Sequence, residues 1–396
     1  MADDPLISLQ DLSVSFPTDD GVVDAVRGVS LDVFPGEVVA IVGESGSGKS
    51  VTVLAIMRLH PKTAQQRGKI VFDGTDILAL SEKQMRQVRG NSIAMIFQDP
   101  MTALNPVFTV GDQIAEMIVT HQPVKKDKAY KTAEELLAKV GVPEAGQRVH
   151  QYPHEFSGGM RQRAMIAMAI ANEPKLLIAD EPTTALDVTI QAQVMEVMKE
   201  VRELTGAAML LITHDLGLVA GSADRIQVMY AGRIFERGSC DEIFYRSQNP
   251  YTRGLMNSIP RVDSAGERLT PIPGAPPSLL ALPAGCSFRP RCGYATDVCG
   301  QSPAELISLD DNHQSRCHNI DALPRFFAGL DEANLDAFAG QKDGFQGVGQ
   351  IVEIDDAHAV QTSDLVEIVV VGDQSAFEVL GQHDEFDVHG LSGEFG

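Results

Sequence analysis

The sequence has no run of apolar residues long enough to cross a lipid bilayer, which requires about 20 in succession. Its longest candidates, such as residues 164–171, are far shorter. The opening stretch MADDPLISLQ is acidic. It lacks the cationic segment followed by an apolar segment that marks a secretory signal. We therefore expect a cytoplasmic protein.

Basic side chains are also scarce. The chain has 32 Lys and Arg against 54 Asp and Glu, a net charge of −22. Residues 326–396 carry most of this excess, with 15 acidic residues and one basic residue. Nucleic-acid binding needs clustered Lys and Arg to neutralise phosphates. We therefore do not expect nucleic acid as a partner.

Cysteine is rare, with five residues in 396, so a disulfide framework is not expected in a cytoplasmic chain. No internal repeat of 20 to 50 residues is visible, which argues against a solenoid. The length allows two or three domains, each with its own core, and a hydrophobic fraction of 44% fits a globular protein.

The hydrophobic pattern predicts an α/β fold. Short strands are expected within residues 7–42, and the apolar run VVAIV should end in a glycine loop followed by a helix over residues 49–60. Residues 93–98, residues 175–180 and the segment around Leu211 read as buried parallel strands. A helical insert is expected between about residues 100 and 160.

The segment GESGSGKS predicts a phosphate-binding loop. Gly43, Gly46 and Gly48 allow a tight turn whose N–H groups point at a phosphate. Lys49 supplies positive charge near the outer phosphates, and the Ser50 hydroxyl can ligate Mg²⁺. The positive end of the following helix adds to the attraction. This pattern predicts nucleotide binding.

A second element, LLIADEP, supplies two carboxylates at the end of a predicted buried strand. Asp180 can hold the water shell of Mg²⁺, and Glu181 can orient and polarise an attacking water. Phosphate loop and acidic pair together predict nucleotide hydrolysis.

With these motifs in place, residues 5–320 resemble the ATP-binding subunit of an ABC transporter. The resemblance implies a P-loop NTPase (RecA-like) fold with a helical subdomain. FSGGM at residues 156–160 matches the signature motif, which contacts ATP held by an opposing subunit. Gln98 matches the Q-loop, residues 185–187 the D-loop, and His214 the switch histidine.

The resemblance implies a full set of site residues. The catalytic ones would be Lys49, Glu181 and His214. Mg²⁺ would be held by Ser50, Gln98 and Asp180. ATP contacts are expected from Phe16 (stacking on adenine), Gly43, Ser45, Gly46, Gly48, Lys49, Ser50, Val51, Gln98, Ser157, Gly158, Gly159, Asp180 and Asp187.

The sequence after the core narrows the family. QNPYTRGLMNSIP and the proline-rich IPGAPPSLLALPAGCSFRPRC are similar to the C-terminal extension of oligopeptide, dipeptide and nickel importers. That resemblance implies ATP-driven peptide import, with nickel or another small solute as the alternative. The implied partners are a second, different ATPase subunit, two transmembrane permease subunits and an extracytoplasmic binding protein. The chain would sit on the cytoplasmic face of the cell membrane.

Two readings from other classes are weaker. A non-transport ABC ATPase acting in DNA repair would carry a long insert between phosphate loop and signature, and one acting in translation would carry two cassettes. A small-molecule kinase with the same phosphate loop would not need SGGMRQR.

The predicted domains are residues 1–260 for the ATPase, 261–325 for the extension and 326–396 for an acidic tail. This tail is either solvated or docked on a basic surface.

Four cysteines cluster within the predicted extension. Cys286, Cys292, Cys299 and Cys317 lack the paired C-x₂₋₄-C knuckles of structural zinc sites. Four separate thiols on loops suit a [4Fe–4S] cluster, which the family resemblance also implies. Zinc and unmetallated thiols stay open as alternatives, and His313 and His318 lie near enough in sequence to replace a ligand. Cys240 stands apart as an ordinary thiol.

Overall fold

The structure, a computed structural model, describes residues 4–184, 186–258, 271–310 and 312–323. The acidic segment 326–396 and the predicted domain boundary near residue 260 lie outside these ranges. None of the helices within them is long and apolar enough to span a membrane.

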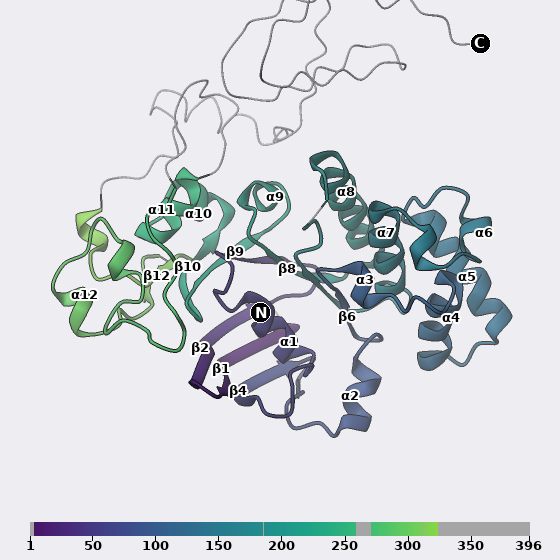
Figure 1. Ribbon diagram of the computed structural model, residues 1–396, viewed down its shortest axis with the longest axis horizontal. Helices are drawn as coiled ribbons and strands as arrows, with labels where there is room; N and C mark the ends of the chain where they lie inside the picture. Colours follow the sequence, from purple (N-terminus) through teal and green to yellow (C-terminus); the bar gives the residue numbers. More distant parts are fainter. Residues whose placement is uncertain (1–3, 185, 259–270, 311, 324–396) are drawn as a thin grey trace, which may run out of the picture. The chain divides into compact units, whose positions relative to one another are not determined.

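The larger of two sheets carries the functional loops (Figure 1). Its order across the described ranges is β11-β12-β10-β9-β3-β8-β7-β6, and the five strands from β9 to β6 run parallel. Its strands are β3 (Val38–Val42), β6 (Ile93–Ile96), β7 (Leu176–Asp180), β8 (Ala208–Thr213), β9 (Arg225–Tyr230), β10 (Arg233–Ser239), β11 (Ile307–Ser308) and β12 (Gln314–Ser315).

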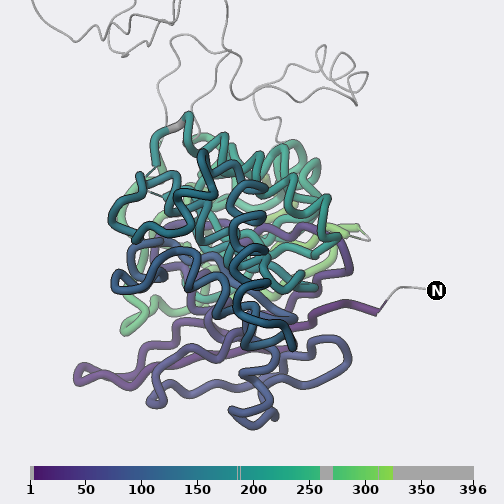
Figure 2. Tube along the Cα trace, turned by 90° about the vertical axis from the view of Figure 1, so that its right-hand side faces the viewer, coloured from purple at the N-terminus to yellow at the C-terminus, as the bar shows by residue number. Residues whose placement is uncertain are grey.

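The smaller sheet is antiparallel, in the order β2-β1-β4-β5. Its strands gather at the bottom of the views in Figures 1 and 2, where the purple N-terminal trace and the blue β4 lie together. Two of its strands are long, against the short strands expected from the sequence. The long strands are β1 (Ile7–Thr18) and β2 (Gly21–Val33), and the other two are β4 (Gln65–Phe72) and β5 (Thr75–Asp76).

The helices of the described ranges pack on the two sheets and on one another. They are α1 (Lys49–Ile56), α2 (Glu82–Val88), α3 (Pro100–Ala103), α4 (Val110–His121), α5 (Lys126–Lys139), α6 (Ala145–Arg148), α7 (Gly158–Ala169), α8 (Val188–Thr205), α9 (Leu216–Ala220), α10 (Cys240–Tyr245), α11 (Pro250–Asn257) and α12 (Val298–Gln301). Short 3₁₀ turns are η1 (Pro153–Glu155), η2 (Arg289–Arg291) and η3 (Ile320–Ala322).

Strand β3 shows how the core is divided. Successive side chains of a strand point to opposite faces, and all five residues of β3 are buried. Val38, Ala40 and Val42 join a cluster with the helical insert and the C-terminal elements. Val39 and Ile41 join a second cluster with the smaller sheet and α1. β3 is therefore covered on both faces.

The predicted α/β architecture is confirmed, and α3 to α6 fill the expected helical insert. The helix after the phosphate loop is shorter than predicted. It ends at Ile56 rather than near residue 60, because Arg58 adopts a left-handed backbone with φ of 51°. The C-terminal segment adds β12 to the sheet edge beside β10, where Ser315 pairs with Glu236.

Candidate nucleotide site

Four parallel strands end at one edge of the larger sheet. β3 leads into the phosphate loop, β7 ends at Asp180, and β6 and β8 are followed within two residues by Gln98 and His214. Ligands of open α/β sheets bind at the carboxyl ends of the strands. The topology thus brings residues 130 or more positions apart in sequence to one site.

The phosphate loop needs glycine at two crowded positions. A Cβ on Gly43 would lie 2.2 Å from the carbonyl oxygen of Met229, and one on Gly48 would lie 2.4 Å from that of Ala25. Both glycines, and Gly46, have positive φ. The loop therefore packs against neighbouring backbone in a conformation that other residues adopt only with strain.

Lys49 opens α1 and is buried within the loop. Its Nζ donates to the carbonyl oxygens of Gly43 at 2.7 Å and Glu44 at 3.1 Å. Burial lowers the pKa of Lys49, and the carboxylates of Glu181, Asp180 and Glu44 oppose that effect. A phosphate entering the loop would add further negative charge beside this buried ammonium and so favour its charged form.

Ser50 and Asp180 form an oxygen pair suited to Mg²⁺. The Ser50 hydroxyl donates to Oδ1 of Asp180 at 2.9 Å. Burial raises the pKa of Asp180, and the donation from Ser50 partly offsets this. Hydroxyl and carboxylate oxygens are the hard ligands that Mg²⁺ prefers, so these residues fit the ion expected from the sequence.

Side chains from several loops converge on the carboxylate of Glu181. Its Oε2 accepts hydrogen bonds from Gln98 Nε2 at 3.1 Å and from Thr184 Oγ1 at 2.9 Å. Nδ1 of His214 lies 3.3 Å from the same oxygen, and Nζ of Lys49 lies 3.8 Å from Oε1. Three predicted residues from separate strand ends thus surround the predicted catalytic carboxylate.

The backbone of Glu181 is strained. Its φ of 48° lies in the left-handed region, and its N–H donates to the carbonyl of Ile212 at 2.8 Å. Such conformations cost roughly 1–3 kcal/mol and persist where the surroundings impose them. In this backbone conformation the side chain of Glu181 reaches Lys49 of the phosphate loop.

The signature and D-loop residues begin helices. Ser157 caps α7 by accepting from the N–H of Met160 at 3.4 Å, and Asp187 caps α8 by accepting from Ile190 at 2.9 Å. Ser157 and Gly158 are exposed. In the described part of the chain, no hydrogen bond or ion pair joins residues 157–159 to the phosphate loop. Ala185 is not among the described residues.

The other predicted ATP contacts lie around α1. Phe16 is half-buried on β1 and meets His60 edge-on, with ring centroids 5.4 Å apart. Ser45 is exposed at the loop tip, and Val51 packs partly buried on α1. Their contacts with a nucleotide stay predictions.

The four clustered cysteines are free thiols gathered in one segment. The N–H of Cys286 donates to the carbonyl of Cys299 at 2.8 Å, and Asn319 donates to the sulfurs of Cys299 and Cys317 at 3.4 Å and 3.3 Å. Burial, and then the neighbouring thiols, raise the pKa of Cys292. The side chains therefore share one environment.

A metal site is not supported by this arrangement. Within the described ranges, no group of three or more His, Cys, Asp or Glu side chains is placed to hold a metal ion. Nε2 of His313 lies 2.9 Å from Oε1 of the fully buried Glu236, so this nitrogen is already engaged. Nε2 of His318 lies 2.9 Å from the carbonyl of Ser302.

Two contacts to the phosphate loop have no local sequence signature. Tyr251 on α11 and Arg291 at the end of η2 both bind Glu44. They lie 207 and 247 residues from it, so no local pattern could have revealed them. Their position in QNPYTRG and SFRPRC, segments that resemble the family's C-terminal extension, was the sequence signal available.

Two family models match this chain. One, described as ABC transporter, matches residues 26–184. The other, described as oligopeptide/dipeptide transporter, C-terminal region, matches residues 235–299. The second model includes the segment that carries Tyr251 and Arg291.

Curated relatives agree with both models. A dipeptide transport ATP-binding protein of Bacillus subtilis is 53% identical over 314 residues, which are 79% of this chain and 94% of that protein. An oligopeptide transport ATP-binding protein of Mycobacterium tuberculosis is 53% identical over 315 residues. The match covers 79% of this chain and 52% of that protein, so the chain spans about half the length of the mycobacterial relative.

Solved structures show the same fold. The ATP-binding cassette MJ0796, a dimer in a post-hydrolysis state bound to ADP and Pi, has a TM-score of 0.54 at 26% identity, over 59% of this chain and 98% of that one. CbiO1 of Clostridium perfringens, part of the ABC transporter complex cbiONQ, has a TM-score of 0.52 at 28% identity, over 61% of this chain and 91% of that one.

Proposed function

The chain belongs to the family of ABC transporter ATP-binding proteins, in its oligopeptide/dipeptide branch, and on that premise we propose that it hydrolyses ATP to power the import of peptides. Residues 1–260 would form the ATPase unit and residues 261–325 the extension typical of the branch.

The observation that carries this proposal is the convergence on Glu181. A carboxylate that meets Gln98, His214 and Lys49 from separate strand ends can act on a water beside a phosphate. Phosphoryl transfer depends mainly on positioning and on neutralising charge. Lys49 would hold the outer phosphates, Ser50 and Asp180 would hold Mg²⁺, and Glu181 would orient the water.

A second ATPase subunit would complete the site. Ser157 and Gly158 are exposed and make no bond to their own phosphate loop within the described residues, so they are free to meet ATP bound by a partner. The relative MJ0796 is solved as a dimer. ATP held between two chains can drive their closure, and hydrolysis can release it. The resemblance of the C-terminal segment to the oligopeptide/dipeptide branch is our reason for proposing a different ATPase, and so a heterodimer, as the partner.

The permease subunits would dock beside Gln98. Met101 is 50% exposed, Val107 is 70% exposed and Phe108 is 50% exposed. These apolar side chains follow the Q-loop residue within ten positions. We propose that they belong to the permease contact, since contiguous exposed apolar surface marks interaction sites. A permease bound there would place the chain on the cytoplasmic face of the membrane, with an extracytoplasmic binding protein delivering peptide.

The four thiols would form the ligand set of a [4Fe–4S] cluster, with zinc as the alternative. The proposal rests on their number and on Asn319, which donates to the sulfurs of Cys299 and Cys317. The described residues do not show these side chains already placed around a metal ion, so binding would have to bring them together. Metal analysis of protein purified without oxygen tests this. Iron with a visible absorbance that Cys292→Ser removes supports the cluster, zinc supports the alternative, and neither metal means free thiols.

ATPase activity of the reconstituted complex with its binding protein tests the proposed function. We expect short peptides to stimulate hydrolysis and Ni²⁺ chelates to leave it unchanged. Stimulation by nickel alone would assign the chain to nickel import. No response to either, in an intact complex that binds ATP, would overturn the peptide assignment.

A further inference from the structure

Glu44 lies inside the phosphate loop, yet its side chain is held by the C-terminal segment. Nη1 of Arg291 donates to Oε2 of Glu44 at 2.6 Å, and Nη2 donates to Oε1 at 2.9 Å. The side chain of Arg291 is 4% exposed and that of Glu44 is 25% exposed. A two-pronged, charge-assisted contact of this kind is strong and fixes orientation as well as distance.

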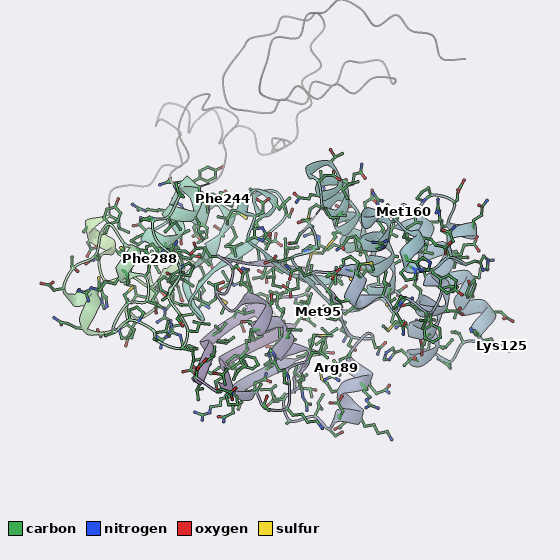
Figure 3. All side chains as sticks on the ribbon, in the orientation of Figure 1. Arg89, Met95, Lys125, Met160, Phe244 and Phe288 are labelled. Carbon is green, nitrogen blue, oxygen red and sulfur yellow. The ribbon has the colours of Figure 1, made fainter. Side chains whose placement is uncertain are left out.

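Arg291 is itself fixed by other contacts. Its Nε donates to the carbonyl of Pro273 at 2.9 Å. Its guanidinium lies 5.9 Å from the ring centroids of both Tyr230 and Phe288. Phe288 lies among the C-terminal elements, on the opposite side of the view from the helical insert (Figure 3). These contacts fix the guanidinium so that its two terminal nitrogens face the carboxylate of Glu44.

The backbone of Glu44 is held from the same side. Its N–H donates to the hydroxyl of Tyr251 at 2.9 Å, and Tyr251 is fully buried on α11. Tyr251 packs on Tyr230 with ring centroids 4.5 Å apart, and on Phe288 at 5.3 Å. One aromatic cluster thus supports both groups that hold Glu44.

Glu44 in turn shapes the loop around Lys49. Its carbonyl accepts from Nζ of Lys49 at 3.1 Å and from the N–H of Ser47 at 3.2 Å. A shift of Glu44 would therefore move the turn that must receive the phosphates. Misplacement of a binding group by about 1 Å is enough to lower activity strongly.

We propose that Arg291 is a positioning residue for the phosphate loop, so that ATP affinity depends on the folded state of the cysteine-bearing segment 286–292. This rests on the proposed function in one respect, namely that the loop binds ATP. Because coupling between two sites is reciprocal, bound ATP in turn stabilises the segment that carries Arg291.

Binding of MgATP to the full chain, measured by equilibrium dialysis, tests the coupling. Arg291→Met and Glu44→Gln should each weaken binding on the order of tenfold, within the usual range of coupling between sites. The double variant should lose no more than either single one, since both remove the same contact. Arg291→Lys should recover part of the affinity. The control is Arg289→Met, an exposed arginine of the same turn, and it should bind as the wild type does.

Hydrogen exchange separates positioning from mere stabilisation. MgATP should slow exchange of residues 286–292 in the wild type and in Arg289→Met, and should not do so in Arg291→Met. If Arg291→Met does not fold, Glu44→Gln and Arg291→Lys provide the same comparison.

Two negative results have different meanings. Wild-type affinity in the Glu44 and Arg291 variants, or additive losses in the double variant, would overturn this inference alone. A wild-type chain that does not bind MgATP would overturn the proposed function instead.

Discussion

Nε2 of Gln98 donates to Oε2 of Glu181 at 3.1 Å, although 83 residues separate the two in sequence. The contact joins the end of β6 to the end of β7. Met101, Val107 and Phe108 follow Gln98 with exposed apolar side chains. A partner that contacts Gln98 would therefore be linked through one side chain to Glu181, the carboxylate that we propose orients the attacking water.

Removing the charge of Glu181 should stop hydrolysis and leave binding intact. Glu181→Gln keeps the size of the side chain and loses the base, and general-base catalysis contributes about 100-fold or more. We expect kcat for ATP to fall by at least that factor while the affinity for MgATP stays within a few-fold of the wild type. Steady-state hydrolysis and equilibrium binding measure the two quantities.

The matched control for that substitution is Glu200→Gln on an exposed part of α8. It should leave both quantities unchanged. A Glu181→Gln variant that hydrolyses ATP at the wild-type rate would show that another group orients the water.

Gly48 should not tolerate a side chain. In Gly48→Ala the new Cβ would approach the carbonyl of Ala25 to 2.4 Å, at a φ of 105°. The backbone strain alone costs roughly 1–3 kcal/mol, so both the free energy of unfolding and MgATP affinity should fall. Urea unfolding and equilibrium binding check this. Gly221→Ala, which has a φ of −104° and no neighbour within 4 Å, should behave as the wild type.

The gathering of the site residues at one edge of the larger sheet was largely predictable, because these residues follow buried strands. Gly43 and Asp180 come at the ends of apolar runs, and parallel strands bring such ends together. The early end of α1 was not predictable, because it depends on the left-handed backbone of Arg58. No propensity pattern in the sequence indicates that conformation.

A large side chain in the signature motif should block assembly and spare binding. In Ser157→Arg the phosphate loop is untouched, so MgATP affinity of the isolated chain should not change. The ATP-dependent association with the partner ATPase should be lost. The arginine side chain would fill the space that we expect the phosphates of the partner-bound ATP to occupy. Sedimentation of the two subunits in the Glu181→Gln background measures this.

Thr63→Arg, on an exposed loop, controls for the added charge and should associate normally. ATP-dependent association that survives Ser157→Arg would contradict a site shared between two chains.

The buried pair of His313 and Glu236 should support stability and not a metal. Truncation in His313→Ala leaves a buried carboxylate without one hydrogen-bond donor, at a cost of about 1–3 kcal/mol. We expect the free energy of unfolding to drop by that amount and the metal content to stay unchanged. His318→Ala, at a half-buried position, should cost less. Metal lost together with His313 would restore it as a ligand.

The contacts of Arg291 and Tyr251 with Glu44 were beyond sequence reasoning. Their sequence separations, 247 and 207 residues, leave no periodic or local signal. The pairing depends on the aromatic cluster of Tyr230, Tyr251 and Phe288, which forms only when α11 and the C-terminal loops pack on β9. The contacts to Glu44 therefore depend on tertiary packing and not on local sequence.

The thiol of Cys240 should stay protonated in the folded chain. Burial, assisted by Asp241 and Asp224, raises the pKa of Cys240 to about 12, against about 8.5 for an unfolded thiol. Between these values the unfolded chain has lost a proton that the folded chain keeps. The contribution of Cys240 to stability is therefore constant below about pH 8.5 and falls as the pH rises toward 12.

Alkylation kinetics check the state of this thiol. Iodoacetamide at pH 8.5 should label Cys240 at least about 100-fold more slowly in the native chain than in urea, because the thiolate is the reactive form. The Cys240→Ala variant identifies the peptide concerned. Equal rates in both states would contradict the raised pKa.

Uptake of labelled peptide into vesicles is the direct test of ATP-driven peptide import. The vesicles would contain the assembled complex, with its binding protein on the outside and MgATP on the inside, where this chain would bind. We expect peptide to accumulate only when ATP is present inside, and not at all with Glu181→Gln. ATP hydrolysis without peptide accumulation in the wild-type complex, or accumulation that persists with Glu181→Gln, would contradict it.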